Sequence, residues 1–529
     1  MEVEPTDFRR ELARVLNINR DRVFAIDARS MKQLTYAEFS ELVDRFSALF
    51  RSRGLAAGDS IISLLPNSVE QLAVIIATMR DGYGFAPLAP QTTTVEVKRF
   101  ALLVRAKLCL HSTSSSSGVV DLLDRLELDH IVAPLGMDFS WLPKKAADTP
   151  GQSATAPVGR LYLGTSGTTG EPKAMVIDPA SLWASAKAFA AKHDFIDPSS
   201  RFFNILPMSY LGGLFNLGLI PLAAGASTCI DEPFSGRSTL SFWNDIQRME
   251  INTLWLVPTM INSLLQMTER KSKGGSRNGT RYPKVRASLL GTAPIELNVK
   301  ERFENAFGIP LIENYALSET TFLSTETIGS RFDRIPGSTG HVLDYVDLEI
   351  RHDAAASGAQ DADTAAGEIA VRTPYAFIGY LNADGSMDIP FDDRGFLMTG
   401  DIGYVDPNGN LIIVGRVKDI IKKGGLVVSL PEIDRVATEC DGVSAAAAVP
   451  VKHAFYGEDV ALAIVPADPD ADAGVLIEKV RQHMMNNLIR YKWPSTITVV
   501  DALPATASGK IKRLDLAGQI TIISAPWTA

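Results

Sequence analysis

Hydrophobic positions in the first part of the chain recur at helical spacing. In residues 35–53, TYAEFSELVDRFSALFRSR, apolar and aromatic side chains return every three or four positions, which is typical of one face of an amphipathic helix. Thr35 is a residue type that caps helix N-termini, and Gly54 is one that follows helix ends, so we expect a helix between them. A short apolar run at 60–65, SIISLL, predicts a strand, and helical spacing returns over 68–80.

This alternation of helical and strand patterns continues to about residue 415 and predicts an α/β fold with largely parallel sheets. Residues 112–118 and 352–367 are rich in small and polar residues and predict loops. Charge and glycine gather in the segment at 411–425, LIIVGRVKDIIKKGG. We therefore expect a large N-terminal domain of layered α/β sheets, residues 1–415, and a smaller mobile C-terminal α+β domain, residues 416–529.

Composition narrows the classes of function. With 529 residues the chain is too long for one compact core, so more than one domain is expected. The net charge of −9 gives no overall electrostatic footprint for nucleic acid, so no nucleic-acid partner is expected. The basic stretch at 271–284, KSKGGSRNGTRYPK, favours a mobile surface loop, with contacts to phosphates as the alternative.

Cysteine usage and the apolar runs indicate a compartment. Cys109, Cys229 and Cys440 lie far apart without metal-ligand spacing, which favours buried free thiols over a nucleophile. Such thiols are typical of a reducing compartment. The N-terminal segment lacks the apolar core of a signal peptide, and no apolar run reaches the roughly 18 residues of a membrane span. The sequence thus predicts a cytoplasmic protein without a membrane span.

A glycine-rich stretch at 164–176, GTSGTTGEPKAMV, directly follows the short apolar run RLYL, which predicts a strand. Successive backbone N–H groups of such a loop form a concavity that binds anions. Ser166, Thr168 and Thr169 add hydroxyl donors, and Lys173 adds a point charge suited to phosphate. The spacing fits neither a Walker loop nor a dinucleotide-binding turn. The lysine and the preceding strand argue against a plain flexible linker.

A second candidate segment reads ENYALSET at 313–320 and resembles the aromatic-Gly-x-[ST]-Glu segment of the adenylate-forming superfamily. The resemblance implies that Tyr315 offers a flat face for a purine and that Glu313 is an acceptor for an exocyclic amine. Glu319 is a hard oxygen ligand suited to Mg²⁺, with a solvated loop residue as the alternative, and Ser318 is placed to bond a phosphate.

Together these segments resemble the signatures of the adenylate-forming, or AMP-binding, superfamily, which includes acyl- and aryl-CoA synthetases, luciferases and adenylation domains of peptide synthetases. Residues 165–173, TSGTTGEPK, match the family pattern [ST]-[ST]-G-T-T-G-x-P-K throughout. Further segments that resemble family motifs are GTAP at 291–294, MTGD at 398–401, GRVKDIIKKGG at 415–425 and PATASGKIKR at 504–513. The N-terminal segment at 35–77 is similar too, so the resemblance covers nearly the whole chain.

The resemblance implies roles for particular residues. Lys510, Glu319 and Lys173 would be catalytic, with Glu319 also holding Mg²⁺. Lys418 would be the pivot of a hinge, and Gly425 would line the tunnel for an incoming thiol. The remaining motif positions would bind ATP, with Asp401 on the ribose hydroxyls and Arg416 on ribose or phosphate. They are Thr165, Ser166, Gly167, Thr168, Thr169, Gly170, Gly291, Thr292, Ala293, Glu313, Asn314, Tyr315, Ser318, Asp401 and Arg416.

The family reaction then implies ATP and Mg²⁺, a small carboxylic acid that becomes an acyl-adenylate, and an acceptor that takes the acyl group. CoA is the expected acceptor, because the Ser508-Gly509-Lys510 form of the last motif is common among CoA-forming members. A free-standing carrier protein and a free amine are the alternatives. A catalytically dead regulator is disfavoured, since Lys173, Glu319, Asp401 and Lys510 are all present.

Two departures from the family pattern bear on the acid. Tyr210 stands in LPMSYLGGL, at 206–214, where CoA synthetases usually carry a histidine, and it cannot titrate near neutrality. Ala316 stands where a glycine usually follows the aromatic residue. In relatives that activate amino acids, an aspartate pairs with the substrate ammonium, and residues 206–214 contain no aspartate. With Leu214 and Phe215, these residues predict an apolar pocket for an aromatic or medium aliphatic acid, with core packing as the alternative for the last two.

Overall fold

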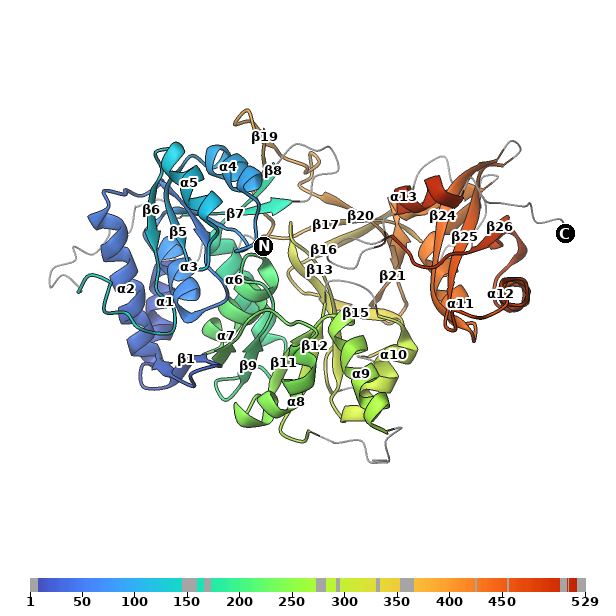
Figure 1. Cartoon of the computed structure of the whole chain (residues 1–529), viewed down its shortest axis with the longest axis horizontal. Helices are drawn as coiled ribbons and strands as arrows, with labels where there is room; N and C mark the ends of the chain where they lie inside the picture. The colour runs from blue at the N-terminus through green and yellow to red at the C-terminus, as the bar shows by residue number, and fades with distance from the viewer. Residues whose placement is uncertain are drawn as a thin grey trace. The chain divides into compact units, whose positions relative to one another are not determined.

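The protein forms two compact units in the computed structural model (Figure 1). The first contains residues 1–334, 343–346 and 372–392, and the second contains residues 335–342, 347–371 and 393–529. Residues 415 and 416 both belong to the second unit, so this division does not coincide with the domain boundary expected between them. That boundary stays a prediction. The structure describes residues 8–144, 159–165, 173–272, 282–291, 295–329, 334–352, 366–423, 426–453, 456–504, 511 and 513–520.

One sheet of the first unit has the strand order β14-β13-β12-β11-β9-β10-β1-β2. Its strands are parallel from β13 to β1, and an antiparallel pair stands at each end, β13 with β14 and β1 with β2. The strands are β1 (Val23–Asp27), β2 (Gln33–Thr35), β9 (Arg201–Asn204), β10 (Ser227–Ile230), β11 (Thr253–Leu256), β12 (Ala287–Leu290), β13 (Leu311–Leu317) and β14 (Thr321–Thr325).

A second sheet of the same unit has the order β19-β18-β8-β7-β4-β3-β5-β6. It is parallel from β7 to β6 and becomes antiparallel from β7 through β8 to β19. Its strands are β3 (Ser60–Leu64), β4 (Gly84–Pro87), β5 (Ala106–His111), β6 (Asp129–Val132), β7 (Arg160–Thr165), β8 (Lys173–Ile177), β18 (Gly379–Leu381) and β19 (Met387–Asp388). The predicted α/β fold is confirmed for this unit.

Helices connect these strands, and the one predicted from residue 35 onward is confirmed as α2 (Tyr36–Ser52). Thr35 and Glu38 form a reciprocal capping box at its start, and Gly54 follows its end with a φ of +75° that favours glycine. The loop expected over 112–118 is wrong at its end, because α5 begins at Ser117. Figure 1 shows α8, α9 and α10 beside β9, β11 and β12. The helices are α1 (Phe8–Ile18), α3 (Val69–Asp81), α4 (Thr94–Leu103), α5 (Ser117–Arg125), α6 (Pro179–Ala191), the π-helix η1 (Gly212–Leu219), α7 (Ile220–Ala223), α8 (Ser238–Arg248), α9 (Pro258–Ser272) and α10 (Leu297–Phe307).

The second unit starts with strands in the order β16-β17-β20-β21-β15. The pairs β15/β21, β17/β20 and β20/β21 are antiparallel, so the expectation of largely parallel sheets is wrong here. Parallel neighbours need a crossover connection, whereas β20 and β21 are joined by a short turn. These strands are β15 (Ser338–Val342), β16 (Asp347–Arg351), β17 (Gly367–Arg372), β20 (Leu397–Val405) and β21 (Asn410–Arg416).

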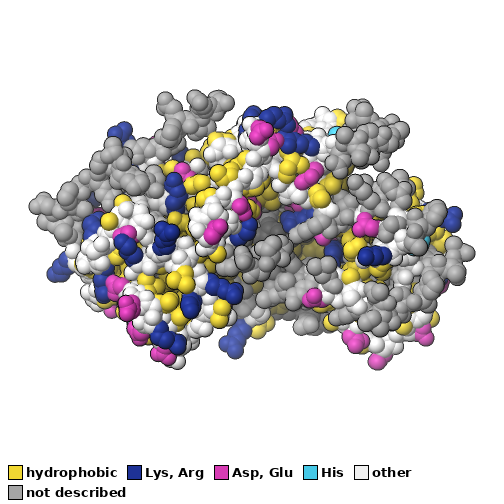
Figure 2. Space-filling model, turned by 90° about the horizontal axis from the view of Figure 1, so that it is seen from above, with side chains coloured by type: hydrophobic (Ala, Val, Ile, Leu, Met, Phe, Trp, Pro, Cys, Tyr) yellow, Lys and Arg dark blue, Asp and Glu magenta, His cyan; other side chains and the backbone are white. Residues whose placement is uncertain are grey.

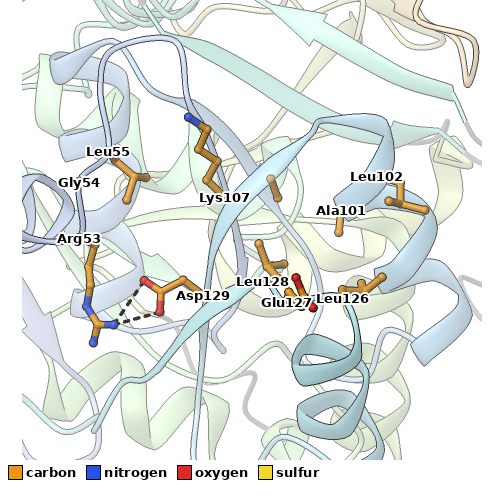
Figure 3. Close-up of a pocket in the computed structure, with 11 residues that line it drawn as sticks. Arg53, Gly54, Leu55, Ala101, Leu102, Lys107, Leu126, Glu127, Leu128 and Asp129 are labelled. Atoms are coloured by element: carbon orange, nitrogen blue, oxygen red, sulfur yellow. Dashed lines mark hydrogen bonds and ion pairs between the residues drawn. The ribbon is translucent and has the colours of Figure 1, made fainter.

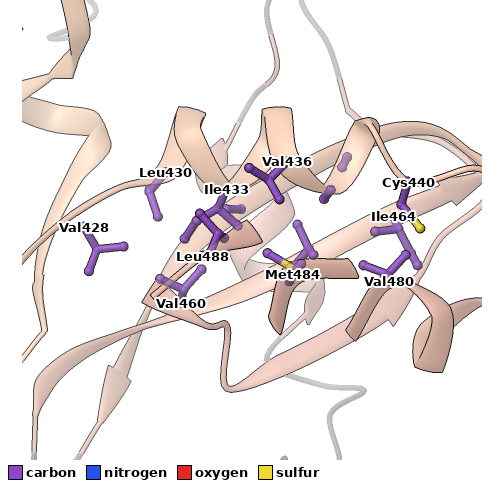
Figure 4. Close-up of a cluster of buried hydrophobic side chains, with 14 of the residues drawn as sticks. Val428, Leu430, Ile433, Val436, Cys440, Val460, Ile464, Val480, Met484 and Leu488 are labelled. Atoms are coloured by element: carbon purple, nitrogen blue, oxygen red, sulfur yellow. The ribbon is translucent and has the colours of Figure 1, made fainter. Parts of the chain in front are cut away.

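A small α+β layer follows, as predicted, and its core is built on the alternation of strand residues. Ala446 and Ala448 of β24 pack in one cluster with residues of α11 and α12, of which Figure 4 labels Val436 and Val480. Ala447 and Val449 face the other side of the sheet and pack with α13. The elements are η2 (Val417–Asp419), β22 (Ile420–Lys423), β23 (Leu426–Ser429), α11 (Leu430–Thr438), β24 (Val443–His453), β25 (Gly457–Pro466), α12 (Ala473–Asn487), η3 (Arg490–Lys492), β26 (Thr496–Val499) and α13 (Arg513–Ile520).

The three cysteines are buried free thiols, which confirms the interpretation from sequence. Burial raises the pKa of both Cys109 and Cys229 to about 12, so neither is a thiolate near neutral pH. Within the described part of the chain, no helix is long and apolar enough to cross a membrane. On the face in Figure 2, basic and acidic side chains are intermixed rather than gathered into a field of one sign.

Candidate functional site

The predicted phosphate loop closes a hairpin between β7 and β8. Thr165 and Lys173, which flank it, are cross-strand partners. A Cβ on Gly164 would lie 3.1 Å from the ring of Phe100, so the strand approaches α4 closely at this point. The middle of the loop, with Ser166, Gly167, Thr168, Thr169 and Gly170, lies outside the described residues.

Lys173 begins β8, and its ammonium contacts a carboxylate that the sequence did not single out. Nζ lies 2.6 Å from Oδ2 of Asp388 in β19, and both side chains are partly exposed. The hydrogen bond from Lys173 holds the pKa of Asp388 below its usual range. A phosphate that binds Lys173 would therefore compete with Asp388. No local sequence signal links two residues so far apart.

Glu319 follows β13 and accepts a hydrogen bond from a second residue that the sequence did not single out. Tyr380 Oη of β18 lies 2.5 Å from Glu319 Oε1. Burial, followed by the bond to Glu319, raises the pKa of Tyr380, so its phenol remains a donor at neutral pH. The backbone N–H of Phe377 donates to the carbonyl of Glu319 at 2.7 Å. The bond from Tyr380 orients the carboxylate, and the bond from Phe377 holds the backbone of Glu319.

The residues around Glu319 bear on the Mg²⁺ expected there. The described ranges contain no group of three or more His, Cys, Asp or Glu residues that could hold a metal ion. Magnesium that accompanies a nucleotide usually binds one or two carboxylates together with phosphate oxygens and water. A single oriented carboxylate such as Glu319 therefore fits this donor set, and its role stays a prediction.

The four residues expected around the acid differ in exposure. Tyr210 is 49% exposed, and its Oη lies 3.3 Å from Ser318 Oγ, while Ala316 is also exposed. Leu214 and Phe215 are buried in the π-helix η1, where the Phe215 ring stacks on Phe322 with centroids 5.6 Å apart. This packing favours the core alternative for Leu214 and Phe215.

Gly291, directly after β12, lies close to Asn314 in the middle of β13. A Cβ on Gly291 would lie 3.0 Å from Asn314 Oδ1, so a larger side chain would press on the amide. Asn314 Nδ2 is buried and has no hydrogen-bond partner among the described residues, and Tyr315 beside it is largely buried. An unsatisfied buried donor is costly, and an acceptor on a ligand would satisfy it. Thr292 and Ala293 lie outside the described residues.

Asp401 and Arg416 are brought together as cross-strand partners of β20 and β21. Arg416 Nε lies 2.8 Å from Asp401 Oδ1, and the exposed fractions of the two side chains are 46% and 4%. Gly400 has a φ of +71°, which favours glycine at this place, and Thr399 Oγ1 accepts from the N–H of Asp401 at 3.1 Å. The backbone of β20 thus positions a buried carboxylate that pairs with Arg416.

Glu313, expected to meet an adenine amine, is engaged elsewhere. Its Oε1 lies 2.8 Å from the ammonium of Lys300, which also contacts Glu326. Burial raises the pKa of Glu313, and the lysine opposes that effect. The sequence did not single out Lys300 or Glu326, because their neighbours in the chain carry no motif.

The hinge and the last motif are described in part. Lys418 lies in the short 3₁₀ turn η2, whereas Gly425 and Lys510 lie outside the described residues. The last motif ends at Arg513, which starts α13 and donates from Nη2 to Asp434 Oδ2 at 2.6 Å. This contact anchors the end of the motif to α11.

A surface pocket of about 360 Å³ in the first unit shares no residue with these positions (Figure 3). An ion pair between Arg53 and Asp129 at 2.9 Å borders it. Its walls come from residues around the amino ends of β5 and β6 and from α4.

Comparisons with known proteins agree with the sequence motifs. The chain matches the family model for the AMP-binding enzyme over residues 12–381 and that for its C-terminal domain over residues 432–510. It is 31% identical to an oxalate–CoA ligase of Arabidopsis thaliana, with 91% of this chain and 92% of that protein covered. It is 27% identical to a sulfoacetate–CoA ligase of Cupriavidus necator, with 94% of each covered. The fold is similar to that of ATP-bound MatB from Rhodopseudomonas palustris, with a TM-score of 0.78, 24% identity, and 97% and 98% of the chains covered.

Proposed function

Because the chain belongs to the AMP-binding enzyme family, we propose that it activates a carboxylic acid with ATP to an acyl-adenylate and transfers the acyl group to the thiol of CoA. By class it is an AMP-forming acid–thiol ligase similar to acyl-CoA synthetases. The observation that carries this class is the match, over nine-tenths of both chains, to relatives that are CoA ligases.

ATP is recognised in this proposal by residues of several motifs. Asn314 donates its buried amide N–H to the base, and Tyr315 offers its ring face. Asp401 accepts from the ribose hydroxyls while Arg416 holds its carboxylate in place. The loop of residues 165–173 binds the phosphates, and Lys173 exchanges Asp388 for a phosphate oxygen.

In the first half-reaction a carboxylate oxygen of the acid attacks the α-phosphorus of ATP. The bond from the α-phosphorus to the bridging oxygen breaks, and pyrophosphate leaves with the electron pair. Since carboxylate and triphosphate repel each other, positive charge is needed at the transition state, and Lys510 and Lys173 supply it. When bound, Mg²⁺ adds charge on the phosphates, and Glu319 is the residue that would hold it. No general base is needed, because the acid is already ionised at neutral pH.

In the second half-reaction the thiol sulfur of CoA attacks the acyl carbon, and AMP leaves with the oxygen that joined it to the acyl group. The thiol proton goes to solvent. We expect the C-terminal domain to turn about Lys418 between the two steps, which removes Lys510 and admits the thiol past Gly425. A rearrangement of this kind is typical of domains joined by small polar interfaces.

The acid we propose is aromatic or medium aliphatic. Tyr210 and Ala316 are accessible and uncharged, and Phe322, the cross-strand partner of Ala316, stacks on Phe215. The two relatives act on oxalate and sulfoacetate, acids with a second anionic group that needs a cationic partner. None of the four positions predicted from sequence, Tyr210, Leu214, Phe215 and Ala316, supplies such a cation.

The test is ATP–pyrophosphate exchange with a panel of acids, followed by mass spectrometry of products formed with CoA, a carrier protein or amines. We expect exchange with aromatic or medium aliphatic acids and a thioester with CoA. Exchange with oxalate alone would contradict the proposed acid, and a product only with carrier protein or amine would replace CoA as acceptor. ATP binding without exchange for any acid would favour a regulator.

A further inference from the structure

Lys300 of α10 is a buried lysine surrounded by carboxylates. Its side chain is 7% exposed, and Nζ lies 2.8 Å from Glu313 Oε1 and 2.8 Å from both oxygens of Glu326. Lysine is almost never fully buried unless its charge is paired. These contacts therefore satisfy the ammonium with charge-assisted hydrogen bonds, which are among the stronger ones in proteins.

Glu326, directly after β14, ties this lysine to the main chain of β13. Its side chain is fully buried, and Oε2 accepts a hydrogen bond from the backbone N–H of Glu313 at 2.8 Å. Its own N–H donates to the carbonyl of Glu313, also at 2.8 Å. Glu326 thus binds both backbone groups of Glu313, while Lys300 binds the side chain. The strand is fixed at the residue immediately before Asn314 and Tyr315.

A second cation extends the network along the same strand. Arg334 Nη2 pairs with Glu304 of α10 and donates to the carbonyl of Leu311 at 3.1 Å, and its Nε lies 3.9 Å from Glu326 Oε2. The charged groups that face Glu326 are therefore Lys300, Glu313 and Arg334, with Glu304 paired to the arginine. Helix α10 holds the start of β13 through charges rather than through apolar packing alone.

We propose that Lys300 is a positioning residue for the nucleotide, acting through Glu313 to set where Asn314 and Tyr315 stand. This inference rests on the proposed function, because it requires those two residues to contact the base of ATP. Replacing a buried ion group by apolar side chains is often neutral or stabilising, so stability alone does not account for these charges. Their place, one residue before the candidate base contacts, gives them a role in binding.

The network also predicts that the effect of removing Lys300 depends on pH. Burial raises the pKa of Glu326 to about 7, and Lys300 works against this shift. Without the ammonium, the pKa of Glu326 and that of Glu313 rise further. At acid pH the two carboxyl groups can then share a proton, which removes the repulsion between two negative charges. A variant without Lys300 should therefore be less impaired in acid than in base.

The test is calorimetric titration of the full chain with ATP alone, so that neither the acid nor the acceptor has to be known. Lys300→Met should weaken ATP binding by about tenfold at about pH 8 and clearly less at about pH 6. Phe303→Leu is the matched control, because Phe303 is fully buried on the same helix and carries no charge. It should lower the melting temperature without a pH-dependent change in ATP affinity.

A second variant guards against misfolding of the first. Lys300→Met with Glu326→Gln keeps the net charge of the network and should fold, yet ATP binding should stay weakened because Glu313 lacks its clamp. Wild-type affinity in both Lys300 variants would overturn the inference while leaving the proposed function intact. The inference would also be overturned if Phe303→Leu and Lys300→Met lowered ATP affinity by the same factor and neither loss depended on pH. Absence of ATP binding by the wild-type chain would overturn the proposed function and this inference together.

Discussion

Arg416 and Asp401 form an ion pair across two adjacent antiparallel strands, with Arg416 Nε 2.8 Å from Asp401 Oδ1. The carboxylate is almost fully buried, whereas the guanidinium reaches solvent. Because the positive φ of Gly400 within β20 and the bond to Thr399 fix the backbone, the position of the carboxylate is defined. Arg416 and Asp401 come from separate motifs, and Arg416 lies where it can orient the carboxylate of Asp401.

Replacing Asp401 should weaken ATP binding. Asp401→Asn removes the charged acceptor proposed for the ribose hydroxyls, and such hydrogen bonds contribute about 1.5–3 kcal/mol, or roughly 10- to 150-fold in affinity. Calorimetry with ATP measures it. Asp406→Asn is the control, because Asp406 only caps the turn between β20 and β21 and should leave the affinity unchanged. Wild-type affinity in a folded Asp401→Asn protein would remove Asp401 from the site.

Tyr380→Phe should slow adenylate formation. The substitution removes the phenol donor that lies 2.5 Å from Glu319 Oε1, so the carboxylate loses the hydrogen bond that orients it. We expect a fall of about tenfold in ATP–pyrophosphate exchange and a higher magnesium concentration for half-maximal rate. Tyr375→Phe, which removes a phenol from the same segment, is the control. An unchanged magnesium requirement would argue that Tyr380 does not act through Glu319.

The stability of the first unit should depend on Glu326 in a defined direction. Its pKa is raised from 4.5 to about 7 in the folded state, so the protonated carboxyl stabilises the fold. This stabilisation is complete below about pH 4.5 and is lost as the pH rises through about 7, a change of up to about 3 kcal/mol. Glu326→Gln lacks this titration. The free energy of unfolding of Glu326→Gln, measured in urea, should therefore rise relative to that of wild type between about pH 5 and about pH 8. A difference between the two proteins that stays constant with pH would refute the assignment.

Local patterns predicted the elements that depend on neighbouring residues. Helix α2 is predicted by its apolar spacing and by Thr35, and β3 by a short apolar run, since both signals lie within the element itself. The sequence predicts largely parallel sheets, and the strands between residues 338 and 416 depart from this because they pair antiparallel. Strand patterns alone do not reveal whether a helix crosses between two strands.

The candidate site shows the same division. The motifs located Asp401 and Arg416, and the structure pairs them. They did not reveal that Lys300 occupies Glu313, or that Tyr380 bonds Glu319 from a strand far along the chain. Such contacts depend on tertiary packing, and Lys300 alone has the sequence appearance of an exposed helix residue. The roles of the motif residues in binding and catalysis stay predictions.

Lys418→Pro should separate the two half-reactions. Lys418 lies in the 3₁₀ turn η2, whose typical φ is close to the value of about −65° that proline requires, so the variant should keep this conformation. If the turn must change for the C-terminal domain to move, one half-reaction should persist while the other falls by orders of magnitude. Pyrophosphate exchange and thioester release measured on the same folded variant decide this. Overall turnover near wild type would show that Lys418 is no pivot.

The path of a single oxygen atom tests the central claim most directly. An acid that supports exchange is labelled with ¹⁸O in its carboxylate and converted in the presence of ATP and CoA, and the phosphorus products are analysed by mass spectrometry. Attack on the α-phosphorus predicts one labelled oxygen in AMP and none in pyrophosphate, and Lys510→Ala should abolish this labelled AMP. Label in inorganic phosphate together with ADP, or thioester formation with unlabelled AMP, would contradict an acyl-adenylate intermediate.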